Sequence, residues 1–212
     1  MNVILVAGGT VDSDQLRKVY ASTDDAYVIG ADRGALTLLK EGIPCDIAIG
    51  DFDSVSDDEK EMLTASEKTE LLKPEKNDTD SEHAFMHALS MKPDSITLFG
   101  CTGSRLDHTL ACINMLKKAF DSGIDARIVD IHNRIRVAAG EVMLSKADAF
   151  GKYVSVLPYG ERIASLTEKG FKYEVEDFTL EKDISRGISN ELSSEEGRIS
   201  SGDYMIIMET ID

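Results

Sequence analysis

The residues best suited to chemistry in this 212-residue chain are two aspartates separated by a single residue. Asp51 and Asp53 follow the apolar run Ile-Ala-Ile and the strand-ending Gly50. In an extended segment residues i and i+2 point the same way, so both carboxylates face one spot beyond the strand. Convergent carboxylates repel each other unless a cation lies between them, and Mg²⁺ is held in this way together with waters and substrate phosphates. The pattern indicates either a Mg²⁺–nucleotide site or an acidic turn that caps the next helix.

Three further aspartates occupy comparable positions in the chain. Asp32, Asp80 and Asp107 each follow a different predicted strand, as the first pair does. The carboxyl ends of parallel strands meet at one edge of a sheet, and open α/β sheets bind their ligands at that edge. We therefore expect these carboxylates to gather there.

Only a few basic side chains accompany these acids. The sequence contains no Gly-x4-Gly-Lys-Ser/Thr loop and no Gly-x-Gly-x-x-Gly turn, so neither a P-loop nor a dinucleotide-binding turn is predicted. A bound nucleotide would depend on carboxylate-held metal and on basic residues such as Lys76 and Arg105. Arg105 is suited either to bridging phosphate oxygens or to pairing with Asp107, and His108 either to contacting a ligand or to capping a helix.

The elements that must position these residues alternate between strand and helix through residues 1–131. Strands are predicted at 2–7, 26–31, 69–72, 95–100 and 126–130 and in the segment before Asp51, with helices at 14–21, from 36 to 42, after 59, at 82–91 and up to about 122. Capping boxes at Ser56–Glu59 and Thr79–Glu82 predict the starts of two helices. The alternation predicts an α/β domain whose mostly parallel sheet carries helices on both faces.

From residue 132 to residue 212 the pattern changes to short strand-like runs separated by turns. The runs lie at 134–138, 142–144, 153–157, 163–166, 171–175 and 204–208. No amphipathic helix is evident among them. We predict a second, all-β domain of the sandwich type over 132–212, directly joined to the first.

Composition excludes several classes of function. The formal net charge of −16 gives no sequence-wide attraction for nucleic acid or anionic lipid, whereas a cationic substrate is attracted. No apolar run approaches the length of a membrane span, and the N-terminus does not have the pattern of a signal peptide. Three cysteines without metal-ligand spacing indicate reduced thiols and a cytoplasmic protein.

The candidate residues belong to an ordered set of short motifs. They are Ala31-Asp32-x-Gly34-Ala35, Gly50-Asp51-Phe52-Asp53-Ser54, Glu75-Lys76-x-x-Thr79-Asp80, Gly103-x-Arg105-Leu106-Asp107-His108-Thr109-Leu110, Gly170-Phe171-Lys172-Tyr173 and Ile188-Ser189-Asn190-Glu191. In this order, and over nearly the whole chain, the set closely resembles bacterial thiamine pyrophosphokinase. Any one motif is weak, but the ordered set is specific, and it favours the metal site at Asp51 and Asp53 over a capping turn.

The resemblance implies a reaction and an assembly. It implies Mg²⁺-dependent transfer of the pyrophosphoryl group of ATP to the hydroxyl of thiamine, with release of AMP. It also implies a homodimer in which the C-terminal domain of one subunit contributes to the thiamine site of the other. The first domain, 1–131, would then bind ATP and Mg²⁺, and the second, 132–212, would bind thiamine.

The resemblance further implies a role for each matched residue. Asp51, Asp53 and Asp80 are the implied metal and phosphate-side carboxylates, and Asp107 is a further catalytic acid. The nucleotide is expected to contact Asp32, Lys76, Arg105 and His108, and thiamine is expected to contact Ser189 and Asn190.

Some positions depart from the family pattern, and other functions compete with this one. Asn77 follows Lys76 where relatives often have aspartate, and the chain has no tryptophan, so Phe171 or Tyr173 is the expected aromatic wall for thiamine. The nearest competing function is the same chemistry on another alcohol, such as a hydroxymethyl pterin. A non-catalytic sensor of nucleotide or thiamine and a metal-dependent phosphohydrolase are the others.

Overall fold

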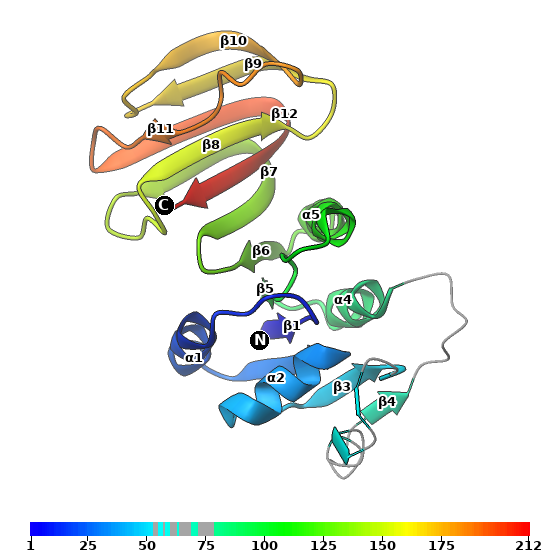
Figure 1. Cartoon of the computed structure of the whole chain (residues 1–212). Coiled ribbons are helices and arrows are strands. Elements are labelled where there is room, and N and C mark those ends of the chain that lie inside the picture. The colour runs from blue at the N-terminus through cyan, green and yellow to red at the C-terminus, as the bar shows by residue number, and fades with distance from the viewer. Residues whose placement is uncertain (53–54, 57, 60–62, 64–68, 72–78) are drawn as a thin grey trace. The chain divides into compact units, whose positions relative to one another are not determined.

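The computed structural model describes residues 1–52, 55–56, 58–59, 63, 69–71 and 79–212. The chain divides into two compact units, Met1–Ile131 and His132–Asp212 (Figure 1). Within the described residues, no helix is long and apolar enough to cross a membrane.

The first unit is built on a parallel sheet. Its strands are β1 (Asn2–Val6), β2 (Ala26–Ala31), β3 (Ile47–Gly50), β4 (Thr69–Leu71), β5 (Ser95–Phe99) and β6 (Asp125–Val129), in the spatial order β6-β5-β1-β2-β3-β4. Every pair of neighbours along this order is parallel. Residues 3–6 of β1 are all buried, as the continuous apolar run requires of a strand covered on both faces.

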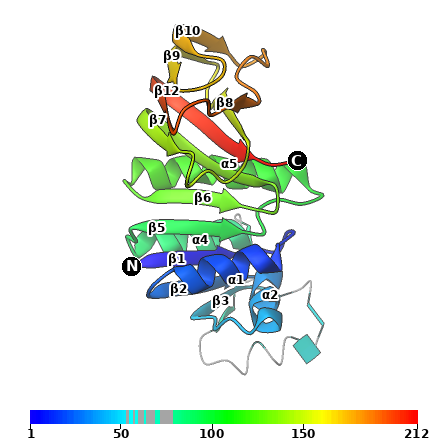
Figure 2. The same ribbon diagram turned by 90° about the vertical axis from the view of Figure 1, so that its left-hand side faces the viewer.

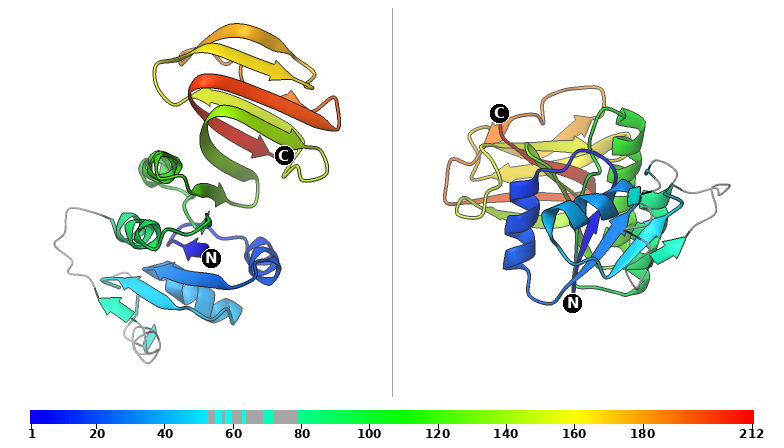
Figure 3. Two further views of the ribbon diagram at one scale, coloured as in Figure 1. Left: turned by 180° about the vertical axis from the view of Figure 1, so that it is seen from behind. Right: turned by 60° about the horizontal axis from the view of Figure 1, so that its bottom comes forward.

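Helices cover both faces of this sheet. They are α1 (Ser13–Ser22), α2 (Arg33–Glu41), α4 (Asp80–Ser90) and α5 (Leu106–Asp121). Helices α1 and α2 lie on one face, and α4 and α5 lie on the other (Figures 2 and 3). The predicted α/β class with helices on both faces is therefore confirmed. Gly42 ends α2 in the left-handed conformation, and Ser56 and Glu59 exchange the hydrogen bonds of a capping box.

The second unit is antiparallel. Its strands are β7 (Asn133–Ser145), β8 (Tyr153–Pro158), β9 (Arg162–Lys169), β10 (Val175–Glu181), β11 (Asn190–Glu191) and β12 (Glu196–Thr210). The long strand β12 pairs with β7 along most of its length, with β9 over Arg198–Ser200 and with β8 over Met205–Thr210. The predicted all-β second domain is therefore confirmed.

Two strand predictions in this unit need correction. The runs 134–138 and 142–144 are both β-strand, as predicted, but they belong to one strand, β7, in which Gly140 takes a positive φ of 80° and β12 shifts register opposite it. The run 171–175 is not a strand. Phe171 makes an isolated bridge to Leu192, and β10 begins only at Val175.

Candidate active site at the carboxyl ends of the parallel strands

A pocket of about 450 Å³ opens where the parallel strands of the first unit end. This volume lies within the range typical of small-molecule sites. It is lined by residues of the segments after β1, β2, β3 and β5, by the start of α4 and by α5. Its lining is Gly8, Gly9, Asp32, Asp51, Thr79, Asp80, Ser81, Gly100, Cys101, Thr102, Gly103, Ser104, Arg105, His108 and Cys112.

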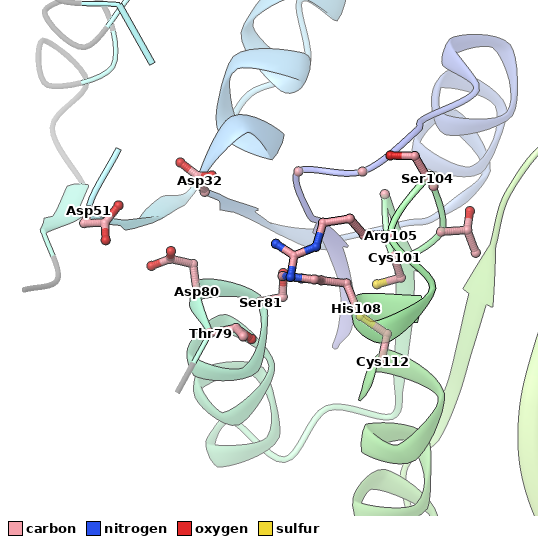
Figure 4. Close-up of a pocket in the computed structure, with 15 residues that line it drawn as sticks. Asp32, Asp51, Thr79, Asp80, Ser81, Cys101, Ser104, Arg105, His108 and Cys112 are labelled. Carbon is pink, nitrogen blue, oxygen red and sulfur yellow. The ribbon is translucent and has the colours of Figure 1, made fainter. Parts of the chain in front are cut away.

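Three predicted acids meet in this pocket. The carboxylates of Asp32, Asp51 and Asp80 project into the same space, and Arg105 enters it from the side of α5 (Figure 4). The expectation that strand ends gather the acids at one edge is met for these three. Asp53 and Lys76 lie outside the described residues.

Asp32 is held in an uncommon backbone conformation. Its φ of 49° is positive, and its N–H donates to the Ile49 carbonyl at 2.9 Å, which ties the end of β2 to β3. Gly50 leaves room for this approach, because a Cβ there would lie 3.2 Å from the Asp32 Cα. A non-glycine residue with positive φ costs about 1–3 kcal/mol and is concentrated at functional sites.

Asp51 is placed by the residue that follows it. Phe52 also has a positive φ, 53°, and its ring is buried in a cluster with Ala35, Leu36 and Ala48. Because the ring points into the core, the preceding carboxylate faces the pocket. The phenylalanine between the two aspartates is thus an anchor for the turn.

Asp80 begins α4. The Thr79 hydroxyl caps this helix by accepting a hydrogen bond from the Glu82 N–H at 3.2 Å. The positive end of the helix dipole favours a carboxylate in the first turn, and it equally favours a bound phosphate. The helix start therefore adds favourable potential to the anion side of the pocket.

Arg105 and Asp107 form an ion pair at the pocket rim. The Arg105 guanidinium donates to Asp107 at 2.6 and 3.2 Å, and this bond lowers the pKa of Asp107 to about 2. Asp107 is not among the lining residues. Both side chains are about two-thirds exposed, so the pair contributes little stability and Arg105 can exchange it for a phosphate. His108, in the first turn of α5, does line the pocket.

Two glycine-containing loops form the floor of the pocket, and sequence reasoning assigned them no role. The Gly9 N–H donates to the Gly100 carbonyl and the Thr10 N–H to the Thr102 carbonyl, at 2.8 and 2.9 Å. A Cβ on Gly9 would lie only 2.4 Å from both carbonyl oxygens. The signal was present as Gly8-Gly9 directly after a strand, but it matches no phosphate-binding motif.

The donor set fits a hard cation. Carboxylate oxygens are the ligands that Mg²⁺ prefers, and this ion usually takes only one or two from the protein and the rest from water and phosphate. Among the described residues, no three His, Cys, Asp or Glu side chains are close enough to form a metal cluster by themselves. The arrangement is thus suited to a metal that arrives with phosphate oxygens.

The predicted thiamine contacts belong to the second unit. Ser189 has a positive φ of 59°, and its N–H donates to the Ser155 hydroxyl at 3.0 Å. Asn190 begins β11 and is buried. Of the two aromatic candidates, Phe171 is buried against Gly197, whereas Tyr173 is 63% exposed.

Comparison with known proteins identifies the family. Residues 20–128 match the family model "Thiamin pyrophosphokinase, catalytic domain", and residues 140–206 match "Thiamin pyrophosphokinase, vitamin B1 binding domain". The thiamine pyrophosphokinase of Bacillus subtilis is 35% identical over 96% of this chain and 95% of its own length. A crystal structure of thiamine pyrophosphokinase from Bacillus subtilis superposes with a TM-score of 0.90 at 32% identity over the whole of both chains.

A second solved structure agrees with the first. Thiamin pyrophosphokinase from Geobacillus thermodenitrificans superposes with a TM-score of 0.86 at 32% identity, covering 100% of this chain and 98% of that one. The two matched regions together cover most of the sequence. The chain therefore belongs to the thiamin pyrophosphokinase family.

Proposed function

We propose that this protein transfers the diphosphoryl group of ATP to the hydroxyl group of thiamine, forming thiamine diphosphate and AMP. The single observation that carries the site assignment is the convergence of three carboxylates and one arginine on one pocket of the matched catalytic domain. The match to a vitamin B1 binding domain favours thiamine over a hydroxymethyl pterin as the acceptor.

We assign the metal ligands to the acids at the strand ends. Asp51 and Asp80, together with Asp53, would hold Mg²⁺, and Asp32 would contact the nucleotide or its metal. Bound Mg²⁺ neutralises phosphate charge and so favours attack at phosphorus. The protein's own part is to orient the phosphates, with Arg105 and the N-terminus of α4 supplying positive potential. Lys76 and His108 complete the proposed nucleotide contacts.

The thiamine hydroxyl must lose its proton during transfer. Asp107 is a poor acceptor while Arg105 stays bonded to it, because a carboxylate with a pKa of about 2 is a weak base. The carboxylates of Asp32, Asp51 and Asp80 are better placed, since they project into the pocket where the phosphates are proposed to bind. We therefore place Asp107 in the catalytic set as the residue that orients Arg105.

We propose that the second unit supplies the acceptor site. Ser189 and the exposed ring of Tyr173 form the proposed thiamine-binding surface, with the buried Asn190 bonded to the Tyr173 backbone, and aromatic rings bind cations on their faces. The family resemblance supports a homodimer in which this unit serves the pocket of the other subunit. Three free thiols support a cytoplasmic location.

A product analysis tests the function. Pure protein is incubated with ATP, Mg²⁺ and thiamine, and the nucleotides are resolved by chromatography. AMP appearing in step with thiamine diphosphate is the expected result. ADP would indicate an ordinary kinase, phosphate or pyrophosphate without acceptor a hydrolase, and thiamine binding without turnover a sensor.

Mixing two inactive variants tests the dimer. Asp51→Asn disables the first unit and Ser189→Tyr the acceptor surface of the second. If each site draws on both subunits, mixed dimers regain part of the wild-type rate because one of their two sites carries neither change. A monomer in solution, or mixtures with no activity despite exchange of subunits, would count against the shared site.

A further inference from the structure

A buried carboxyl group lies directly beneath the proposed acceptor surface. Glu168 is on β9 and is 4% exposed. Its partners across the sheet are Val175 on β10 and Ile199 on β12, both apolar. A carboxylate in such surroundings is costly unless something bonds to it.

The only side-chain amide bonded to Glu168 in the described structure is that of Asn190. Asn190 Nδ2 donates to Glu168 Oε1 at 3.5 Å and to the Tyr173 carbonyl at 2.9 Å. Its Oδ1 accepts from the Tyr173 N–H at 3.1 Å and the Glu191 N–H at 3.0 Å. The amide thus uses both donors and both acceptor positions inside the protein.

These hydrogen bonds argue against the expected direct contact of the Asn190 amide with thiamine. A saturated amide has no hydrogen bond left for a ligand, but it fixes both backbone groups of Tyr173. The Tyr173 ring itself stays exposed, with the Lys172 ammonium 5.4 Å from its centre. Asn190 therefore acts on the acceptor surface by holding Tyr173 in place.

The charged side chains on the neighbouring elements are engaged elsewhere. Lys169 pairs with Glu174 and Glu176, Lys172 and Lys152 pair with Glu191, and Arg198 pairs with Glu141. Burial raises the pKa of Glu168 to about 7, and the bond from Asn190 opposes this rise only in part. Near neutral pH the carboxyl is thus divided between its two protonation states.

We propose that Glu168 is a positioning residue for thiamine binding, acting through the Asn190 amide on the backbone of Tyr173. The inference rests on the proposed function, because it takes Tyr173 and its surroundings as the acceptor surface. An ionised Glu168 accepts the Asn190 bond more strongly than a neutral one. A cationic thiamine on this surface favours the ionised form, so thiamine binding and proton release from Glu168 are linked.

Calorimetry of thiamine binding tests this linkage without turnover. Wild type, E168Q and E176Q are titrated with thiamine at pH 7 in buffers of different ionisation enthalpy. A fall of about one unit in the Glu168 pKa on binding corresponds to release of about 0.4 proton in wild type. E176Q makes the same chemical change at an exposed glutamate one strand away and should release as much, whereas E168Q should release almost none.

The affinities give a second readout. The thiamine dissociation constant of wild type is divided by that of E168Q at each pH. This ratio should fall about threefold to tenfold between pH 6 and pH 8, and KM for ATP should not change. A ratio that does not change with pH, or equal proton release from wild type and E168Q, overturns the inference. Should E168Q fail to fold, absence of proton release from wild type overturns it alone. A wild type that makes no thiamine diphosphate contradicts the proposed function instead.

Discussion

Replacing Glu168 with glutamine removes a buried carboxyl whose ionisation opposes folding. In the folded unit its pKa is raised from 4.5 to about 7, chiefly by burial. In the unfolded chain the group is in water and keeps its ordinary value. The pKa of Glu168 is higher in the folded protein than in the unfolded chain. Its contribution to the free energy of unfolding is therefore fully present below pH 4.5 and is lost as the pH rises through about 7.

The size of this loss follows from the two pKa values. One pKa unit corresponds to about 1.4 kcal/mol, so the complete effect is about 3 kcal/mol, of which about 2.5 kcal/mol falls between pH 5 and pH 8. Glutamine has nearly the same volume, and its Oε1 can accept the same bond from Asn190. E168Q should therefore gain about 2.5 kcal/mol relative to wild type when the pH is raised from 5 to 8.

Urea-induced unfolding at several pH values measures this gain. The free energy of unfolding of E168Q minus that of wild type is followed from pH 5 to pH 8, so that any constant cost of the substitution cancels. E176Q is the control, because the bond from Lys169 lowers the pKa of Glu176 and no gain at high pH is expected. A difference between E168Q and wild type that stays constant with pH would refute the reasoning.

Three further predictions concern the two proposed sites. Asp51→Asn should lower kcat by about 100-fold or more while circular dichroism and Tm stay unchanged, because the lost contact is with metal and phosphate at an exposed sheet edge; a near-wild-type rate would contradict the metal assignment. Asp107→Asn should raise KM for ATP by about tenfold or less without moving the pH optimum, since its pKa of about 2 keeps it ionised throughout the assay range; a shifted optimum would make it the base. Tyr173→Ala should raise KM for thiamine by about tenfold, whereas Tyr173→Phe should keep a KM near that of wild type. KM for ATP should stay constant in both variants. Equal effects on KM for thiamine and KM for ATP would show that Tyr173 is not part of the acceptor surface.

The first unit was predictable because its signals are local. Each strand is a short buried run, each helix has its own start or stop signal, and a parallel sheet brings the strand ends to one edge whatever the order of the strands. That is why Asp32, Asp51 and Asp80 were expected together. What the sequence could not supply is the approach of Gly9 to Gly100, because it depends on two loops from different strands meeting.

The second unit was predictable in class but less so in detail. Alternation of apolar and polar residues identifies a β segment. One long strand and two short strands separated by a glycine, however, show the same alternation in the sequence. In the structure β7 continues through Gly140, and β12 shifts register beside it. The segment from Phe171 to Val175 has strand-like residues, yet the Asn190 amide takes both backbone groups of Tyr173 and leaves none for a ladder.

Both proposed sites contain non-glycine residues with a strained backbone conformation. Among the described non-glycine residues with positive φ are Asp32, Phe52 and Ser189, and each lies at or beside a predicted ligand contact. Such a conformation costs about 1–3 kcal/mol, and burial of a phenylalanine ring contributes about 1.5–3 kcal/mol. Phe52 can therefore offset the strain of its own turn, which explains why an anchor of that size separates two acids. Ser189 has no comparable side chain, so its conformation depends on its bond to Ser155 and on the hydrogen bonds of the neighbouring Asn190 amide. Weakening the hydrogen bonds of Asn190 should therefore affect the acceptor surface more than the nucleotide pocket.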